Sequence, residues 1–211
     1  MELYFSPLSC SMASRIALYD AGATAAFIEV DAATKRTAAG DDFRAINPLG
    51  LVPTLRTDAG ELLTENAAIL QYLARHLPAA QLAPVDGFAL AQLQQWLCFI
   101  GTELHQAVFK ALLSKTAPAE VKAYALAHSR ARLEVLERHL ADREFLLDRF
   151  SVADAYLVTV LTWTAATPID LGDWPALRAY VTRLRARPSV ARALAEEVPL
   201  YRREQAGAAR R

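Results

Sequence analysis

The sequence predicts two domains of different fold class, an α/β domain followed by an all-α domain. Over the first third of the 211 residues, short apolar segments alternate with helical patterns and are separated by turn residues. A segment rich in proline and alanine then interrupts the pattern, and beyond it apolar residues recur at helical spacings. We expect an α/β domain at 1–77, a linker at 78–86, a helical domain at 87–200 and a frayed tail at 201–211.

The α/β domain begins with a strand, a helix and a second strand. Residues 2–5 and 26–30 have the apolar character of strands, and a helix fills most of the sequence between them. Gly22 stands where a helix ends in the left-handed conformation. A polar loop at 35–40 follows the second strand.

The second half of this domain predicts a short helix, two strands and a longer helix. The short helix is expected at 41–46 and a strand at 52–56, which the turn at 58–60 joins to a hairpin partner at 61–63. Thr64 then caps the longer helix. The order βαβ followed by ββα indicates a mixed sheet with helices on its faces.

Five helices are expected after the linker. They begin at about Phe88, which opens a long helix to about Ser114, at Pro118, at Ser151, near Trp174-Pro175, and after Pro188. On the second helix, four leucines share the face predicted to be buried: Leu126, Leu133, Leu136 and Leu140. Ser151 and Asp154 have the spacing of a capping box, which stabilises the third helix and has no catalytic role.

Composition excludes several classes of protein. The 23 basic residues balance the 23 acidic ones, whereas a nucleic-acid surface needs a basic excess. No apolar run approaches the roughly 18 residues of a membrane span, and the N-terminus lacks the pattern of a secretory signal. Two cysteines form no disulfide framework, so we expect a cytoplasmic protein with free thiols. We also expect no bound metal and no nucleic-acid or membrane partner.

Cys10 lies where the first strand joins the first helix. Unpaired backbone N–H groups and the positive end of the helix dipole favour a thiolate there, so we expect its pKa to fall below the usual value of about 8.5. The alternative is a small buried hydrophobic residue. Ala13 stands where a C-x-x-C motif would have its second cysteine, which excludes a dithiol cycle within this loop.

Two further segments have the chemistry to bind a peptide. A cis bond at Val52-Pro53 would turn the Val52 N–H and C=O outward to pair with an extended peptide, and the alternative is an ordinary trans proline. At Thr64-Glu65-Asn66, N–H groups at a helix start attract anions, and Glu65 can meet an ammonium group. Together they would recognise an amino-acid backbone, whereas the alternative is simple helix capping.

In this order and spacing, the motifs resemble the glutathione S-transferases, specifically the bacterial beta class, over nearly the whole chain. The resemblance is carried by Leu3-Tyr4-Phe5-Ser6-Pro7 with Cys10-Ser11, Asn47-Pro48-Leu49-Gly50-Leu51-Val52-Pro53, and the stretches 63–69, 71–73, 96–100 and 102–105. It implies a thioredoxin-like domain with a cis proline, an all-α domain, a homodimer, and glutathione as cosubstrate. The implied activity is conjugation of glutathione to a small apolar electrophile.

The resemblance also implies a role for each matching residue. Cys10 would face the glutathione sulfur, and Ser11 and His105 are the candidate donors to that sulfur. The other residues expected to bind glutathione are Lys35 for a carboxylate, Val52 with Pro53 for the cysteinyl backbone, Glu65 with Asn66 for the γ-glutamyl end, and Cys98, Thr102, Glu103 and Leu104 on the long helix.

Three positions depart from the class pattern. Asn66 stands where the class often has Gly or Ser, Cys98 where it often has Asn, and Gln106 where Lys follows the histidine. The Asn66 amide can still donate and accept, so binding should survive that change. The loss of a polar contact and of a positive charge at the other two positions predicts weaker glutathione affinity.

The electrophile is expected in a pocket between the domains. Its candidate lining residues, which can equally belong to the core, are Phe109, Leu113, Tyr156 and Trp163. Conjugation is the main functional prediction. Glutathione-dependent disulfide exchange or reduction at Cys10, and a binding module without catalysis, are the alternatives.

Overall fold

The computed structural model describes residues 1–208, which form two compact units. One unit contains Met1–Leu82 together with the segment that begins at Arg187, and the other contains Ala83–Ala186. We expected one division of the chain, in the linker at 78–86. The structure has a second division at Arg187, which assigns the last helix to the first unit.

The first unit is built on a four-stranded mixed sheet in the order β2-β1-β3-β4. β1 (Glu2–Phe5) pairs parallel with β2 (Ala26–Glu29) and antiparallel with β3 (Thr54–Arg56), which pairs antiparallel with β4 (Leu62–Leu63). The predicted mixed sheet is therefore confirmed. β3 begins after Pro53, which has no N–H for the ladder, so it is shorter than expected.

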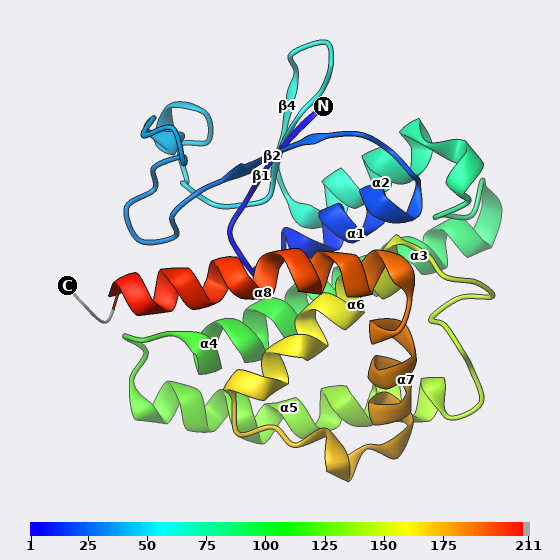
Figure 1. Ribbon diagram of the computed structural model, residues 1–211. Helices are drawn as coiled ribbons and strands as arrows, with labels where there is room; N and C mark the ends of the chain where they lie inside the picture. Colours follow the sequence, from blue (N-terminus) through cyan, green and yellow to red (C-terminus); the bar gives the residue numbers. More distant parts are fainter. Residues whose placement is uncertain (209–211) are drawn as a thin grey trace. The chain divides into compact units, whose positions relative to one another are not determined.

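Two helices cover the sheet, and a third packs beside them. α1 (Met12–Asp20) lies over β1, and α2 (Asn66–His76) lies over β3 and against α1. α8 (Pro188–Ala208), red in Figure 1, packs along α1. The expected helix at 41–46 is a single 3₁₀ turn, η1 (Phe43–Ala45), and another 3₁₀ turn, η2 (Pro78–Ala80), lies in the expected linker.

Charge-assisted hydrogen bonds join the start of α8 to the end of α1. The Arg187 guanidinium donates to both Asp20 carboxylate oxygens, with N–O distances of 2.6 and 2.7 Å, and the Ser189 hydroxyl donates to the same carboxylate at 2.6 Å. Further along, Arg203 pairs with Glu29 of β2 at 2.8 Å. The prediction of a frayed tail is thus wrong for 201–208, which continue the helix, and residues 209–211 lie outside the described part of the chain.

The second unit contains four of the five helices expected beyond the linker. The long first helix consists of α3 (Gly87–Phe99), a π-helical segment η3 (Ile100–Phe109) and α4 (Lys110–Leu113). It is followed by α5 (Ala119–Leu140), α6 (Val152–Thr162) and α7 (Pro175–Arg185), with two 3₁₀ turns after α6, η4 (Trp163–Ala166) and η5 (Leu171–Asp173). No helix within residues 1–208 combines the length and the apolar character that a membrane crossing needs.

The predicted buried face of α5 is wrong for one of its four leucines. Leu126 is 36 % exposed, whereas Leu133, Leu136 and Leu140 are buried. The buried positions of the first half of α5 are Ala125 and Ser129. These two residues continue the 3.6-residue repeat back from Leu133 and take the place predicted for Leu126.

The capping box at the start of α6 is confirmed and extended. The Ser151 hydroxyl accepts from the Ala153 N–H, and the Ser151 N–H donates to Asp154 at 2.9 Å. The fully buried Asp154 carboxylate also accepts from the Leu146 N–H and the Tyr180 hydroxyl, both at 2.9 Å. It therefore joins α6 to α7 and to the preceding loop.

Replacing Asp154 with alanine should lower the free energy of unfolding by about 3 kcal/mol, because four buried donors lose their acceptor. Urea unfolding measures the change. The control is Asp170→Ala, which removes an exposed cap of η5 and should cost less than about 1 kcal/mol. Equal costs for the two variants would contradict a special role for Asp154.

Candidate active site

Cys10 lies in the turn between β1 and α1, next to the helix N-cap Ser11. Its half-buried thiol donates to the carbonyl oxygen of Val52, with an Sγ–O distance of 3.4 Å. The backbone N–H groups of Cys10 and Ser11 interact with the sulfur and favour the thiolate, as expected for a helix start. Burial outweighs them and raises the pKa of Cys10 to about 12, so the prediction of a lowered pKa is wrong.

The Ser11 hydroxyl is engaged within the turn. It is fully buried, donates to the Ser6 carbonyl oxygen at 3.3 Å and shares a hydrogen bond of 2.7 Å with the Ser9 hydroxyl. In this geometry, the Ser11 hydroxyl that the sequence suggested as a donor to the sulfur is occupied, and the Ser11 N–H donates to the Ser9 hydroxyl at 3.3 Å.

The segment that faces Cys10 has the expected cis bond at Val52-Pro53. Within residues 1–208, the Val52 N–H donates to no group, which leaves it available to a ligand. Asn47 holds this segment, because its amide donates to the Leu51 carbonyl at 2.8 Å and to the Thr54 hydroxyl at 3.2 Å. Sequence reasoning gave Asn47 no role, and the Asn47-Pro48 pair in the quoted motif was its only signal.

Glu65, rather than Thr64, is the N-cap of α2, and its side chain makes no capping hydrogen bond. Its φ of 64° is a left-handed conformation, and its carboxylate is exposed. The alternative of simple capping by this segment is therefore ruled out. The negative charge of Glu65 also contributes to the raised pKa of Cys10, so both groups belong to one electrostatic site.

Asn66 is buried and only half satisfied. Its carbonyl oxygen accepts from the Ser14 hydroxyl of α1 at 3.1 Å, which fixes the orientation of the amide. Its amide nitrogen has no partner among the described residues. Since buried donors are nearly always paired, this nitrogen is ready to donate to a ligand atom. Ser14 was missed in the sequence, where it is one more polar residue of a helix.

Lys35 reaches the same region from the loop after β2. The residue has a φ of 59°, and its side-chain stem passes Gly50, where an added Cβ would lie 3.3 Å from Lys35 Cδ. Gly50 has a φ of 61° and belongs to the segment that leads to Val52. The first unit thus brings the side-chain stem of Lys35 beside the segment with the cis bond.

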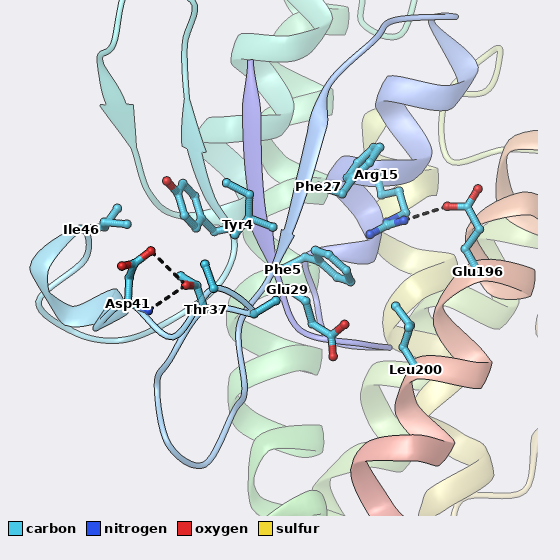
Figure 2. Close-up of a pocket in the computed structure, with 13 residues that line it drawn as sticks. Tyr4, Phe5, Arg15, Phe27, Glu29, Thr37, Asp41, Ile46, Glu196 and Leu200 are labelled. Carbon is cyan, nitrogen blue, oxygen red and sulfur yellow. Dashed lines mark hydrogen bonds and ion pairs between the residues drawn. The ribbon is translucent and has the colours of Figure 1, made fainter.

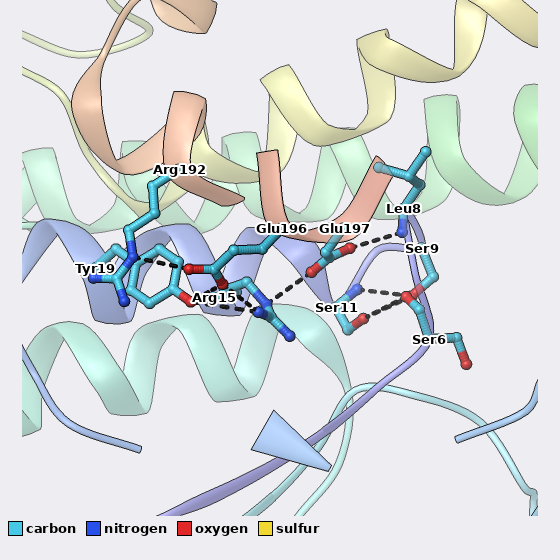
Figure 3. A network of polar contacts seen from close by, with 9 residues as sticks. All are labelled: Ser6, Leu8, Ser9, Ser11, Arg15, Tyr19, Arg192, Glu196 and Glu197. Carbon is cyan, nitrogen blue, oxygen red and sulfur yellow. Dashed lines mark hydrogen bonds and ion pairs between the residues drawn. The ribbon is translucent and has the colours of Figure 1, made fainter. Parts of the chain in front are cut away.

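Next to the Cys10 turn lies an ionic network that is buried at Arg15 and Glu197 and exposed at Arg192 (Figure 3). Leu8, at a φ of 57°, donates its N–H to one Glu197 carboxylate oxygen at 2.7 Å, and Arg15 pairs with the other at 2.8 Å. The Arg15 guanidinium carbon lies 4.1 Å from the ring centroids of both Phe5 and Phe27. Arg15 also donates to the Glu196 carboxylate at 2.8 Å. That carboxylate accepts from the Tyr19 hydroxyl and pairs with Arg192 as well.

A separate pocket of about 740 Å³ lies along β2 (Figure 2). Its lining combines aromatic and aliphatic side chains with carboxylates from the strands, the following loop and α8: Tyr4, Phe5, Phe27, Ile28, Ile46, Leu200, Glu29, Asp41 and Glu196, with Arg15, Thr37, Ala38 and Ala39. None of the residues that the sequence suggested for glutathione lines this pocket.

The candidates on the long helix of the second unit have different surroundings. Cys98 is exposed, and its carbonyl accepts from the Thr102 hydroxyl at 3.0 Å. Glu103 is held by two Arg132 nitrogens at 2.8 and 3.1 Å, and Leu104 is fully buried. Both side chains thus have their contacts within the second unit: the Glu103 carboxylate pairs with Arg132, and Leu104 belongs to the core.

His105 lies among aromatic side chains of the second unit. Its Nδ1 is 2.8 Å from the Tyr156 hydroxyl oxygen, and its ring centroid is 4.9 Å from that of Trp163. Phe109, fully buried, also packs against Trp163, whereas Leu113 is 38 % exposed. Burial lowers the pKa of His105 to about 4, so its imidazole is neutral at pH 7.

Comparison with known proteins agrees with the fold. Residues 9–76 match the family described as glutathione S-transferase, N-terminal domain, and residues 95–188 match glutathione S-transferase, C-terminal domain. The glutathione S-transferase GstA of Escherichia coli O157:H7 is 40% identical over 199 residues, which cover 93% of this chain and 98% of GstA. The chain therefore belongs to the glutathione S-transferase family.

Solved structures give the class. The ternary complex of BphK, a bacterial glutathione S-transferase, is 43% identical with a TM-score of 0.90, over 93% of this chain and 99% of BphK. The bacterial beta-class enzyme of Sphingomonas chungbukensis is also 43% identical, with a TM-score of 0.89 over 93% and 98% of the two chains. The resemblance to the bacterial beta class that the sequence predicted is thus confirmed.

Glu197→Gln should change the dependence of stability on pH. Burial raises the pKa of Glu197 from 4.5 to about 7, so between these values the folded protein binds more protons than the unfolded chain. This carboxyl therefore makes the free energy of unfolding fall as pH rises from 5 to 7. The variant lacks that contribution, so its stability should decline less, or rise more, across this window than that of the unmodified protein.

Urea unfolding at several pH values checks this, with Glu196→Gln as the matched control. The pKa of Glu196 is lowered, so this neighbour is ionised throughout the window and its replacement should leave the slope unchanged. Parallel curves for the Glu197 variant and the unmodified protein would refute the assignment of the raised pKa.

Proposed function

We propose that the protein is an enzyme that binds glutathione on its first unit and conjugates it, through its sulfur, to a small apolar electrophile. The observation that carries this proposal is a set of polar groups around Cys10 that have no hydrogen-bond partner among the described residues. They are the Val52 N–H, the Asn66 amide nitrogen and the Glu65 carboxylate, which makes no capping hydrogen bond. A sphingomonad glutathione S-transferase that is 43% identical to this chain was solved in complex with glutathione.

The charges of these groups fit glutathione, which has two carboxylates, one ammonium group and an extended peptide backbone. Glu65 would meet the ammonium group, while the Asn66 amide and Lys35 would each donate to a carboxylate. The N–H and C=O of Val52 would pair with the backbone of the cysteinyl residue in the manner of an added strand. Binding then requires few changes in the first unit, because these groups are already oriented.

Conjugation forms a bond between sulfur and carbon and expels the leaving group with its electron pair. The glutathione thiol must first lose its proton to solvent, so donors that stabilise the thiolate lower the barrier. The N–H groups that now face the Cys10 sulfur are such donors, and His105 is proposed as another. Because Cys10 has a pKa near 12, it is a neutral neighbour of this thiolate, which favours conjugation over exchange chemistry at Cys10.

Two further proposals follow from the resemblance to the beta class. The protein would act as a homodimer in the cytoplasm, where the free thiols of Cys10 and Cys98 stay reduced. Sedimentation equilibrium at micromolar concentration gives the mass of the assembly, and a monomer would overturn the first of these proposals.

Cys10→Ser separates conjugation from thiol exchange. We expect glutathione conjugation to a model aryl halide to fall less than about tenfold, because the backbone donors remain. Turnover of a glutathionyl mixed disulfide should disappear, because the serine hydroxyl cannot take part in the exchange. Loss of conjugation by a folded variant that still binds glutathione would instead make Cys10 the reacting group.

Lys35→Met and Glu65→Gln test the binding site. Each removes one charge-assisted hydrogen bond, so the Kd for glutathione should rise about 10-fold or more in isothermal titration calorimetry. Arg36→Met is the matched control, because this neighbouring cation donates to the Gly40 carbonyl within its own loop and should change the Kd less than about twofold. Unchanged affinity in both test variants would contradict the proposed site.

A further inference from the structure

The side chains around His105 hold its imidazole ring in one orientation. The ring stands nearly perpendicular to that of Tyr156, at 89°, and meets Trp163 at an interplanar angle of 67°. Trp163 is in turn backed by the fully buried ring of Phe109 at a centroid distance of 5.8 Å. Reversal of the imidazole would replace Nδ1 by a carbon at the Tyr156 hydroxyl and lose the hydrogen bond between them.

The hydrogen bond between Nδ1 and the Tyr156 hydroxyl has two possible directions. A phenol is a good donor and a poor acceptor, and a neutral imidazole nitrogen is a good acceptor, so the hydroxyl is expected to donate to Nδ1. A neutral histidine that accepts at Nδ1 has its proton on Nε2. The first direction therefore leaves Nε2–H as the group that His105 can offer to a ligand.

The electrostatics agree with a neutral imidazole. The side chains that face His105 from the other elements of its unit, Tyr156 of α6 and Trp163 of η4, carry no charge. On its own helix, the positive charge of Lys110 adds to burial in lowering the pKa of His105. A protonated imidazole would also have to give up Nδ1 as an acceptor for the Tyr156 hydroxyl.

We propose that Tyr156 is a positioning residue, whose hydroxyl holds His105 as a neutral donor with its proton on Nε2. The use of that donor toward the glutathione sulfur rests on the proposed function, whereas the tautomer does not. Tyr156 was expected in the wall of the electrophile pocket. At 3 % exposure it offers almost no surface to a substrate, but its hydroxyl reaches the histidine.

Nitrogen-15 NMR of the full chain labelled at histidine tests the proposal without any ligand. The chain contains four histidines, and the signals of His105 are assigned by their absence in His105→Gln. From pH 5.5 to 7.5, we expect the pattern of a neutral ring protonated at Nε2. A proton on Nδ1, or an imidazolium at pH 7, would overturn the proposal.

Tyr156→Phe then tests the role of the hydroxyl. Without it, we expect a mixture of His105 tautomers and a higher His105 pKa. We also expect kcat for conjugation to fall about tenfold, while KM for glutathione changes less than about twofold, because the binding groups of the first unit are untouched. Unchanged tautomer and pKa in the folded variant would show that Tyr156 only packs against the ring.

Tyr180→Phe is the matched control. It removes another buried tyrosine hydroxyl of the second unit, which donates to Asp154 at 2.9 Å, so it should lower stability and leave the His105 signals unchanged. If Tyr156→Phe does not fold, the tautomer of the unmodified protein still decides the proposal. If the protein does not bind glutathione, the proposed function fails, but the NMR result remains valid.

Discussion

A buried charge needs a partner, and in the first unit this requirement ties the end of the chain to the turn that contains Cys10. The side chains of Arg15 and Glu197 are almost completely withdrawn from solvent, so either one alone would be strongly destabilising. The second Glu197 oxygen accepts the Leu8 N–H, two residues before Cys10. The geometry of the turn that contains Cys10 therefore depends on a residue of α8.

Burial also sets the charge states of the Cys10 thiol and the His105 imidazole. It raises the pKa of Cys10 to about 12 and lowers that of His105 to about 4, so both are neutral at pH 7. The charges of the candidate site come instead from Glu65 and Lys35. A protein of this kind supplies dipoles and hydrogen-bond donors, and leaves the reactive anion to its ligand.

Local patterns in the sequence predicted most of the elements. Apolar segments marked the strands, Ser151 and Asp154 marked the start of α6, and the motif around Pro53 identified the cis bond through the family resemblance. What they missed depends on packing between distant residues. The Cys10 pKa was predicted in the wrong direction, because the helix-start donors are visible in the sequence and the burial around the thiol is not.

Two other differences have the same origin. Leu8 and Glu197 are separated by 189 positions, so no local spacing could have joined them. The π-helical segment that contains His105 follows no composition rule and occurs within a pattern that reads as ordinary helix. Asn66 was recognised as a candidate, but only the structure revealed that its amide nitrogen is buried without a partner.

The return of α8 to the first unit has a consequence for the order of events during synthesis. The Cys10 turn and α1 are synthesised before the second unit, whereas Glu196 and Glu197 follow it, so Arg15 can gain these carboxylate partners only after the second unit has been made. A chain that stops short of α8 would therefore leave the guanidinium group beside Phe5 and Phe27 without either carboxylate.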